Sequence, residues 1–132
     1  LFYTGIMCEE IIMEHEFFIL ENEEILNESK WFLRKNISKK NILLNDDVIE
    51  GDSLFFKGFK SFKVSLKNPG EGLDYGGITL IPYTSMNNFI NNLRKVEVSD
   101  YVNEYQRRQI KDLIMLSEEA AEKKLYIIHF GL

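Results

Sequence analysis

Several features are scarce in this sequence of 132 residues, and each scarcity removes a class of protein. Cys8 is the only cysteine, which excludes an internal disulfide framework and leaves no thiol set for a structural zinc site. No apolar run approaches the roughly 18 residues that span a bilayer. The opening LFYTGIMCEE lacks the cationic lead of a signal peptide. We therefore expect a cytoplasmic protein without a membrane partner.

Linkers and repeats are also missing, whereas core-forming residues are plentiful. No internal repeat, low-complexity tract or proline-rich linker interrupts the chain, which has two prolines. Apolar residues make up 45% of the sequence, and phenylalanine alone occurs 10 times. Such a composition supports a packed core rather than disorder. The length fits one unit, and we predict a single domain over residues 1–132.

The negative charge of the chain is concentrated in its first part. The net charge is −5, and residues 1–52 hold 12 acids against 5 bases. Residues 53–100 hold 6 bases against 4 acids, and residues 101–132 hold 5 of each. An acidic half argues against direct binding of nucleic acid, because phosphate affinity depends on lysine and arginine. It allows attraction to a basic protein, although acidic solvated faces are also common on proteins that merely stay soluble.

Apolar patterns predict several short strands. Residues 11–20 indicate a strand covered on both sides, because both of its faces carry apolar groups near the end. Residues 54–66 indicate a strand pair or one bulged strand, with Phe62, Val64 and Leu66 on its apolar side. Two further strands are predicted at residues 78–81 and at residues 125–132.

Turns separate these strands, and one segment is ambiguous. Short polar side chains predict turns at residues 45–47 and 50–53, and the run Asn68–Gly72 predicts another. Residues 22–37 fit a helix or contain a short strand around Trp31, and we favour the helix.

Two amphipathic segments in the second half of the chain predict helices. Ser85 is placed to cap the first helix, because apolar residues follow it at helical spacing through Leu93. The second begins near Ser99 or Asp100, and Ser117–Glu119 leaves open two helices that meet at a kink. Its predicted buried stripe consists of Val102, Tyr105, Gln109, Ile110, Leu113, Leu116, Ala120 and Ala121.

The order of these elements indicates the fold class. Strands come first, helices cluster late, and parallel β–α–β alternation is absent for most of the length. We predict an α+β fold with a mostly antiparallel sheet, two or three helices packed on one face, and a C-terminal strand that closes the sheet.

The glycines at Gly70, Gly72, Gly76 and Gly77 raise the question of a ligand loop. A dinucleotide-binding fingerprint places its glycines after a strand and at the start of a helix, whereas these precede a strand. Nearby acids would also repel a phosphate. We interpret the glycines as residues that permit a tight turn or a close backbone approach.

No other pattern indicates a catalytic or metal site. His15 lies between Glu14 and Glu16, and consecutive strand residues alternate faces, so these carboxylates cannot share a metal shell with the imidazole. His129, in the last predicted strand, is expected to be hydrogen-bonded or at an edge. No nucleophile elbow appears, and no pair of acids stands out. We expect no catalytic residue, no metal, no cofactor and no enzymatic activity.

Two stretches resemble parts of a known group of proteins. The strand Gly77-Ile-Thr-Leu-Ile-Pro82, with Ser85 and the helix 86–93 after it, resembles a strand–proline–helix element of small bacterial immunity proteins. The ending Ile127-Ile-His-Phe-Gly131 resembles their closing strand. These proteins are the partners of polymorphic or contact-dependent growth inhibition toxins. The resemblance covers about residues 73–94 and 124–132.

The resemblance implies a non-enzymatic, cytoplasmic protein that binds one cognate toxin domain, most often a nuclease, and blocks its basic active-site cleft. No family catalytic residues exist to transfer, so our candidate partner-binding residues come from charge alone. An acidic surface would dock such a cleft quickly. The candidates are Glu21, Glu23, Glu24, Asp46, Asp47, Glu50 and Asp52.

Two other hypotheses belong to different classes of protein. One is a small-ligand-binding or enzymatic α+β domain that uses the loop Gly70–Gly77. This hypothesis predicts a concave pocket with convergent polar groups near that loop. The other is a structural module of a larger assembly.

Overall fold

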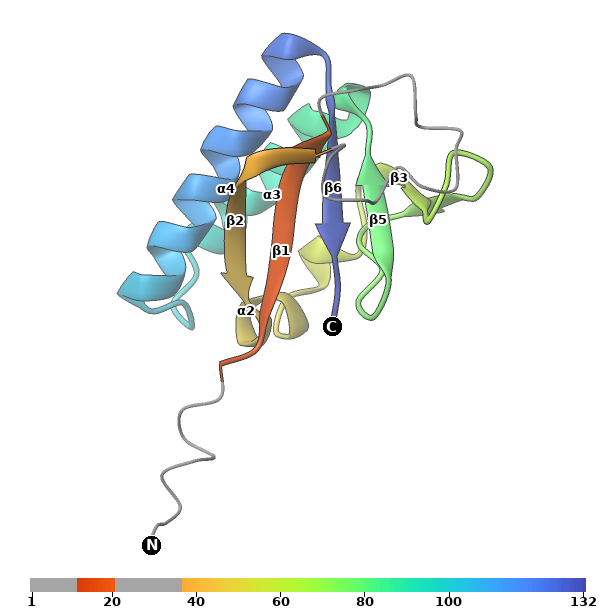
Figure 1. Cartoon of the computed structure of the whole chain (residues 1–132). Coiled ribbons are helices and arrows are strands. Elements are labelled where there is room, and N and C mark those ends of the chain that lie inside the picture. The colour runs from red at the N-terminus through yellow and green to blue at the C-terminus, as the bar shows by residue number, and fades with distance from the viewer. Residues whose placement is uncertain (1–11, 21–36) are drawn as a thin grey trace, which may run out of the picture.

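The computed structural model describes residues 12–20 and 37–132 (Figure 1). The segment 22–36, for which we favoured a helix, lies outside the described residues. The elements in chain order are β1 (Glu14–Leu20), β2 (Ile37–Asn45), α2 (Asp46–Glu50), η3 (Ser53–Phe55), β3 (Lys60–Lys63), β4 (Pro69–Glu71), β5 (Ile78–Ile81), η4 (Tyr83–Ser85), α3 (Met86–Glu97), α4 (Glu104–Lys123) and β6 (Tyr126–Phe130).

The strands form one sheet, and the predicted α+β class is confirmed. Within the described residues the sheet has six strands in the order β2-β1-β6-β5-β3-β4, and each pair of neighbours is antiparallel. The last strand, β6, lies in the middle of the sheet between β1 and β5. Helices α3 and α4 lie together on one face of the sheet, and the short α2 lies at one end of it (Figure 1).

The main core lies between the sheet and these two helices. Alternate strand residues such as Phe17 and Ile127 face the helices, and Phe89 and Leu93 of α3 pack against them. The ring of Phe89 lies 4.9 Å from that of Phe59 and 6.4 Å from that of Phe17, measured between centroids. Burial of each such side chain stabilises the fold by about 1.5–3 kcal/mol.

Side chains on the opposite face of the central strands form a second apolar cluster. Phe18, Leu20, Leu80 and Ile128 are all buried there, and Phe130 packs against them. Strand β1 is therefore buried on both of its faces near its end. This confirms the prediction made from the apolar residues on both parities of residues 11–20.

The long helix differs from its prediction at its start and at its middle. It begins at Glu104 rather than near Ser99, because Asn103 and Gln106 form a capping box. It also continues unbroken through Ser117, whose hydroxyl donates to the Leu113 carbonyl inside the helix. Tyr105, which we predicted to be buried, is 49% exposed.

Two further expectations about local structure were wrong. The Ser85 side chain does not cap α3 but donates to the Lys60 carbonyl of β3, which joins the helix start to the sheet. Residues 69–71, predicted as part of a turn, form the edge strand β4. Pro69 is tolerated there because an edge strand leaves one row of backbone donors unused.

Val64 breaks the strand that we predicted over residues 54–66. Strand β3 ends at Lys63, and Val64 has a φ of +68°, a conformation that is costly for a β-branched residue. The Ser65 amide donates to the Lys63 carbonyl across Val64, and the Val64 amide donates to Ile78. The surrounding bonds hold a strained tight turn in which Val64 is 51% exposed.

Replacing this valine by glycine should relieve the strain. We expect Val64→Gly to raise the free energy of unfolding by about 1 kcal/mol, because glycine adopts positive φ without steric cost. Urea denaturation measures the change. Val98→Gly is the matched control, since Val98 is also exposed but has a φ of −92°. Equal destabilisation by both substitutions would contradict the assignment of strain to Val64.

Candidate functional site

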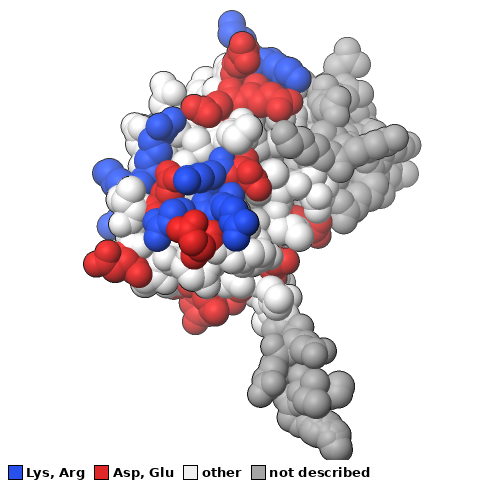
Figure 2. Space-filling model, turned by 90° about the vertical axis from the view of Figure 1, so that its left-hand side faces the viewer, with Lys and Arg blue, Asp and Glu red and all other residues white. Residues whose placement is uncertain are grey.

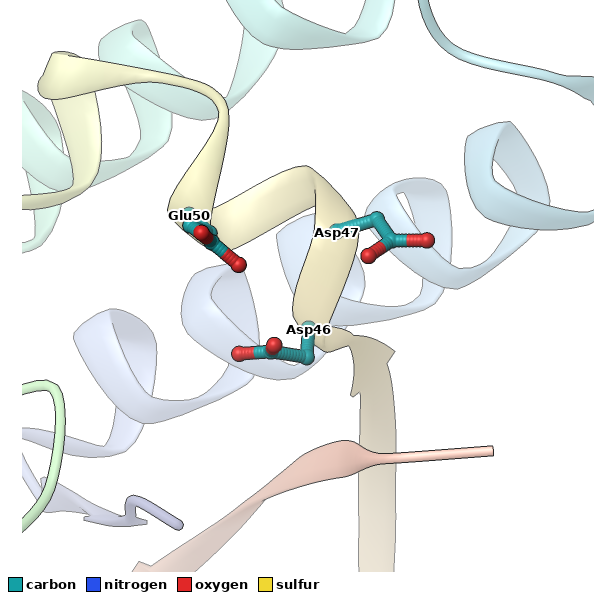
Figure 3. Close-up of side chains that lie close together, drawn as sticks. All are labelled: Asp46, Asp47 and Glu50. Carbon is teal, nitrogen blue, oxygen red and sulfur yellow. The ribbon is translucent and has the colours of Figure 1, made fainter. Parts of the chain in front are cut away.

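Four of the predicted partner-binding acids lie together at one end of the molecule. Asp46, Asp47 and Glu50 belong to α2, and Asp52 caps the short η3 helix through the Leu54 amide. Figure 3 shows the α2 carboxylates projecting from neighbouring turns of the chain. The run DDVIEGD at residues 46–52 contains no lysine or arginine. We call Asp46, Asp47, Glu50 and Asp52, with the tyrosines described below, the α2 surface.

Short polar side chains explain why α2 forms where turns were predicted. The Asn45 side chain accepts a hydrogen bond from the Asp47 amide, which caps the helix at its start. Two acids in the first turn are also favourable near the positive end of a helix. Val48 and Ile49 enter the main core and anchor the helix.

Three tyrosines surround these carboxylates. The Tyr101 hydroxyl donates to Asp52 Oδ2 at 2.8 Å, and the Tyr105 hydroxyl donates to Glu14 Oε2 at 3.0 Å. Tyr75 also lies near this end, where hydrogen bonding with the Asp46 carboxylate is the main cause that raises the pKa of Tyr75 to about 12. All three rings remain between 37% and 49% exposed. The tyrosines therefore fix the acids and still present aromatic surface.

Apolar side chains lie beside this acidic and aromatic surface. Ile12 and Met13 are more than half exposed, and they line a groove of about 270 Å³ together with Asn45, Asp46 and Asp47. The Met13 carbonyl accepts from the Asp46 amide, which attaches this segment to α2. The end of the molecule thus combines exposed charge, aromatic rings and apolar groups.

The charge differs between this end and the neighbouring face. Figure 2 shows the side of the molecule on which α4 lies, with Lys and Arg interspersed among Asp and Glu. In that view the lower margin, at the height of α2 in Figure 1, shows acidic but no basic side chains. An acidic margin next to a mixed face supports a directional electrostatic field at the α2 end.

Asp46 differs from the other candidate acids because it is only 8% exposed. Its Oδ1 lies 2.9 Å from Nε2 of His15, which is fully buried. On the other side of the His15 ring, Nδ1 lies 2.8 Å from Nε2 of His129. His129 Nδ1 in turn lies 3.2 Å from Thr79 Oγ1. We call Asp46, His15, His129 and Thr79 the buried polar chain.

The proton positions in the buried polar chain follow from its ends. The Asp74 amide donates to Thr79 Oγ1 at 2.8 Å, and Asp46 can only accept while it is ionised. His15 must then donate from Nε2 to Asp46 and accept at Nδ1. His129 must donate from Nε2 to His15 and accept from the Thr79 hydroxyl at Nδ1. Every polar atom is satisfied with both imidazoles neutral, and the two ring planes are only 10° apart.

The burial of His129 in this polar chain lowers its pKa. Burial lowers its pKa well below the usual 6.5, and the charge of Lys63 and any positive charge on His15 lower it further. The position in a central strand explains the burial, since β6 is paired on both sides. His129 is hydrogen-bonded, as the sequence predicted, but it does not lie at an edge.

The sequence missed the buried polar chain because its members are far apart. His15 and His129 are separated by 114 residues and become neighbours only because β1 and β6 pair. The sequence does not predict that β1 and β6 pair. In this pairing His129 lies directly opposite Phe17. The available signal was a histidine on the same side of β1 as Phe17 and Ile19, and another in the otherwise apolar or aromatic β6. The expectation that Glu14 and Glu16 turn away from His15 agrees with its burial between them.

The remaining candidate acids divide into two groups. Glu21, Glu23 and Glu24 lie outside the described residues. Among those described, Asp47 and Glu50 are exposed, and Asp52 is half-buried. The acids chosen from charge alone thus include three that lie together in α2, and their role in binding stays a prediction. Asp46 offers little surface to a partner, because it is buried against His15.

The α2 carboxylates are close enough to raise the question of a metal ion. Oxygen atoms of Asp46, Asp47 and Glu50 lie within 4.8 Å of one another. One oxygen of Asp46 already accepts from His15, and its carboxylate also accepts from Tyr75. Exposed acids at this spacing are common without an ion, and we assign no metal to them.

The loop Gly70–Gly77 does not enclose a ligand site in the described part of the chain. A groove of about 660 Å³ touches only its start, at Gly70 and Glu71, beside Phe59 and Phe62. The Glu71 carboxylate there accepts from the Gly58 amide. Gly72 serves close packing, because it has a φ of +66° and a Cβ on it would lie 2.2 Å from the Phe56 backbone. This supports the structural interpretation of the glycines.

Comparison with known proteins gives no further guidance. No protein-family model, no curated protein and no solved structure was found to match the chain. Among the described residues, no helix is long and apolar enough to cross a membrane. The resemblance to immunity proteins therefore stays a prediction from sequence.

The buried polar chain predicts how stability depends on pH. Unfolding restores the pKa of His129 to about 6.5, so the unfolded state binds more protons below that pH than the folded state does. The free energy of unfolding should fall as the pH falls below about 6.5, by up to about 1.4 kcal/mol per pH unit. Urea denaturation between pH 7.5 and pH 5 measures this slope.

His129→Gln is the matched variant for this measurement. Its amide can still donate to His15 Nδ1 but does not titrate. We expect the slope below pH 6.5 to become shallower by about one proton, while other groups keep their contribution. Parallel slopes for the wild type and the variant would contradict the role given to His129.

Proposed function

We propose that this protein is a cytoplasmic, non-enzymatic immunity protein that binds and neutralises a cognate bacterial toxin domain through the α2 surface. The observation that carries the proposal is the gathering of exposed acids, exposed tyrosines and exposed apolar residues at one end. Such a mixture suits a protein partner better than a small molecule. The resemblance of residues 77–93 and 127–131 to immunity proteins supplies the biological context.

Each component of the α2 surface has a role in this proposal. The carboxylates of Asp47 and Glu50 attract a basic partner and increase the rate of encounter. Tyrosine is enriched among residues that dominate binding energy, because its ring buries a large area and loses little conformational freedom. Hydrogen bonds to Asp52 and Glu14 already hold the Tyr101 and Tyr105 hydroxyls before a partner arrives. Pre-arranged side chains lower the entropic cost of association.

A nuclease is the toxin class that this surface fits best. Its active-site cleft must be basic in order to bind a phosphate backbone. Carboxylates can occupy the positions where phosphates would bind, which blocks the cleft without chemistry. The competing hypothesis of a small-ligand site at Gly70–Gly77 is less well supported. In this loop Glu71 accepts a hydrogen bond from the Gly58 amide, and Gly72 packs closely against the Phe56 backbone.

Co-expression tests the proposed function directly. The toxin domain encoded beside this gene should arrest growth when expressed alone, and growth should recover when this protein is co-expressed. Size-exclusion chromatography should show a 1:1 complex that weakens as salt rises. Undiminished growth arrest in cells that contain the soluble, folded protein would contradict the proposal.

Charge reversal tests which surface is used. The double substitution Asp47→Lys and Glu50→Lys should slow association with that domain about tenfold at low salt, with a smaller effect on dissociation. Stopped-flow or surface plasmon resonance measurements separate the two rates. We leave Asp46 unchanged because it supports the fold through His15.

The matched control carries the same change in net charge at the far end of α4. Glu118→Lys with Glu122→Lys alters two exposed acids that lie away from α2 (Figure 1). This variant should associate at nearly the wild-type rate. If both double variants slow association equally, the effect comes from net charge and the α2 surface is not the interface.

A further inference from the structure

In the buried polar chain beneath the α2 surface, a single added proton would exchange donor and acceptor in two hydrogen bonds. These are the bonds from His15 to His129 and from His129 to Thr79. We propose that His15 and His129 form a one-proton switch, which offsets the charge of Asp46 when it is protonated and thereby weakens binding of a basic partner as the pH falls. The effect on binding rests on the proposed function. The switch itself is a property of the isolated chain.

The protonated state keeps every hydrogen bond between the members of the chain. A proton added at His15 Nδ1 turns that nitrogen from acceptor into donor, so that His129 must accept at Nε2. His129 then takes the other tautomer and donates from Nδ1 to Thr79 Oγ1. This oxygen can accept a second bond beside that from the Asp74 amide. The positive charge then lies on the His15 ring, next to the Asp46 carboxylate, whereas the added hydrogen lies between His129 Nδ1 and Thr79 Oγ1.

A second proton does not fit. His15 Nδ1 and His129 Nε2 are 2.8 Å apart, and only one hydrogen can lie between them. Two imidazolium rings at this distance would also repel each other, with little solvent to screen their charges, because both side chains are fully buried. In the unfolded chain the two histidines bind two protons independently. The folded pair can therefore take up one added proton, whereas the two histidines of the unfolded chain take up two.

The charges around the pair determine where the proton is stabilised. Asp46 is the acid in direct contact with it, at 2.9 Å from His15. Lys63 opposes a positive charge on His129, so the charge is better placed on His15. The groups that face the pair are Asp46 of α2, Lys63 of β3 and the ring of Tyr75 in the β4–β5 loop. Asp47 and Glu50 act on Tyr75, and Asp74 acts on Lys63, whereas Glu14 and Glu16 lie on the opposite face of β1 from His15.

Protonation of His15 changes the α2 surface without moving it. The imidazolium and Asp46 form an ion pair whose net charge is zero, which removes one negative charge from beneath Asp47 and Glu50. A basic partner then meets a weaker field. A difference of one charge at this depth corresponds to a change of about fivefold in affinity.

Nuclear magnetic resonance of the unaltered chain tests the switch without any partner. Nitrogen-15 chemical shifts report which ring nitrogens carry protons. At pH 8 both histidines should carry the proton on Nε2. As the pH falls within the folded range, the pair should take up one proton in total, and His129 should change tautomer. Uptake of two protons by the folded chain, or a proton on Nδ1 of His15 at pH 8, would overturn the proposal.

Affinity for the toxin domain encoded beside this gene tests the coupling to binding. Between pH 8 and pH 5 the wild type should lose about fivefold more affinity than His15→Gln, each compared with its own value at pH 8. His15→Asn serves if His15→Gln does not fold. Equal losses in the wild type and the variant would overturn the coupling. If the domain does not bind at all, the proposed function fails while the magnetic resonance result still decides the switch.

Discussion

The hydrogen bond between His15 and His129 is the contact on which the α2 end of this protein depends. It joins β1 to β6 across the middle of the sheet, and its extensions reach Asp46 on α2 and Thr79 on β5. A buried polar chain stabilises little when complete, but an unsatisfied member costs about 1–3 kcal/mol. The position of α2 against the sheet is therefore fixed by a chain of groups that must all be satisfied together.

The α2 surface can be understood as the exposed end of that chain. His15 holds Asp46 from inside, and Val48 and Ile49 lie in the main core, so the helix that carries Asp47 and Glu50 has little freedom to shift. Further bonds from Tyr101 and Tyr105 fix the rim. A surface arranged in this way before binding offers charge for steering and rigid rings for contact. This combination is what an inhibitor that blocks a basic cleft requires.

Local patterns in the sequence predicted the elements whose residues decide their own structure. Short runs rich in apolar residues identified β1 and β5, and the spacing from Met86 to Leu93 identified α3. Strand β2 was missed, because its lysines and asparagine hide the few apolar residues that face the core. Val64 and Ser85 were misjudged because tertiary bonds to Ile78 and Lys60 override their local preference. The acidic cluster was visible as charge, whereas the histidine contact depends on pairing between strands at opposite ends of the chain.

Amide hydrogen exchange of the complex with the toxin domain encoded beside this gene tests the central claim most directly, since it maps the contact surface without altering a residue. We expect binding to slow exchange in residues 45–52 and 101–105, which carry the acids and two of the tyrosines of the α2 surface. Exchange around Gly58–Phe62 and Pro69–Glu71, which line the larger groove, should be unchanged. Protection confined to that groove, with none at α2, would contradict the account.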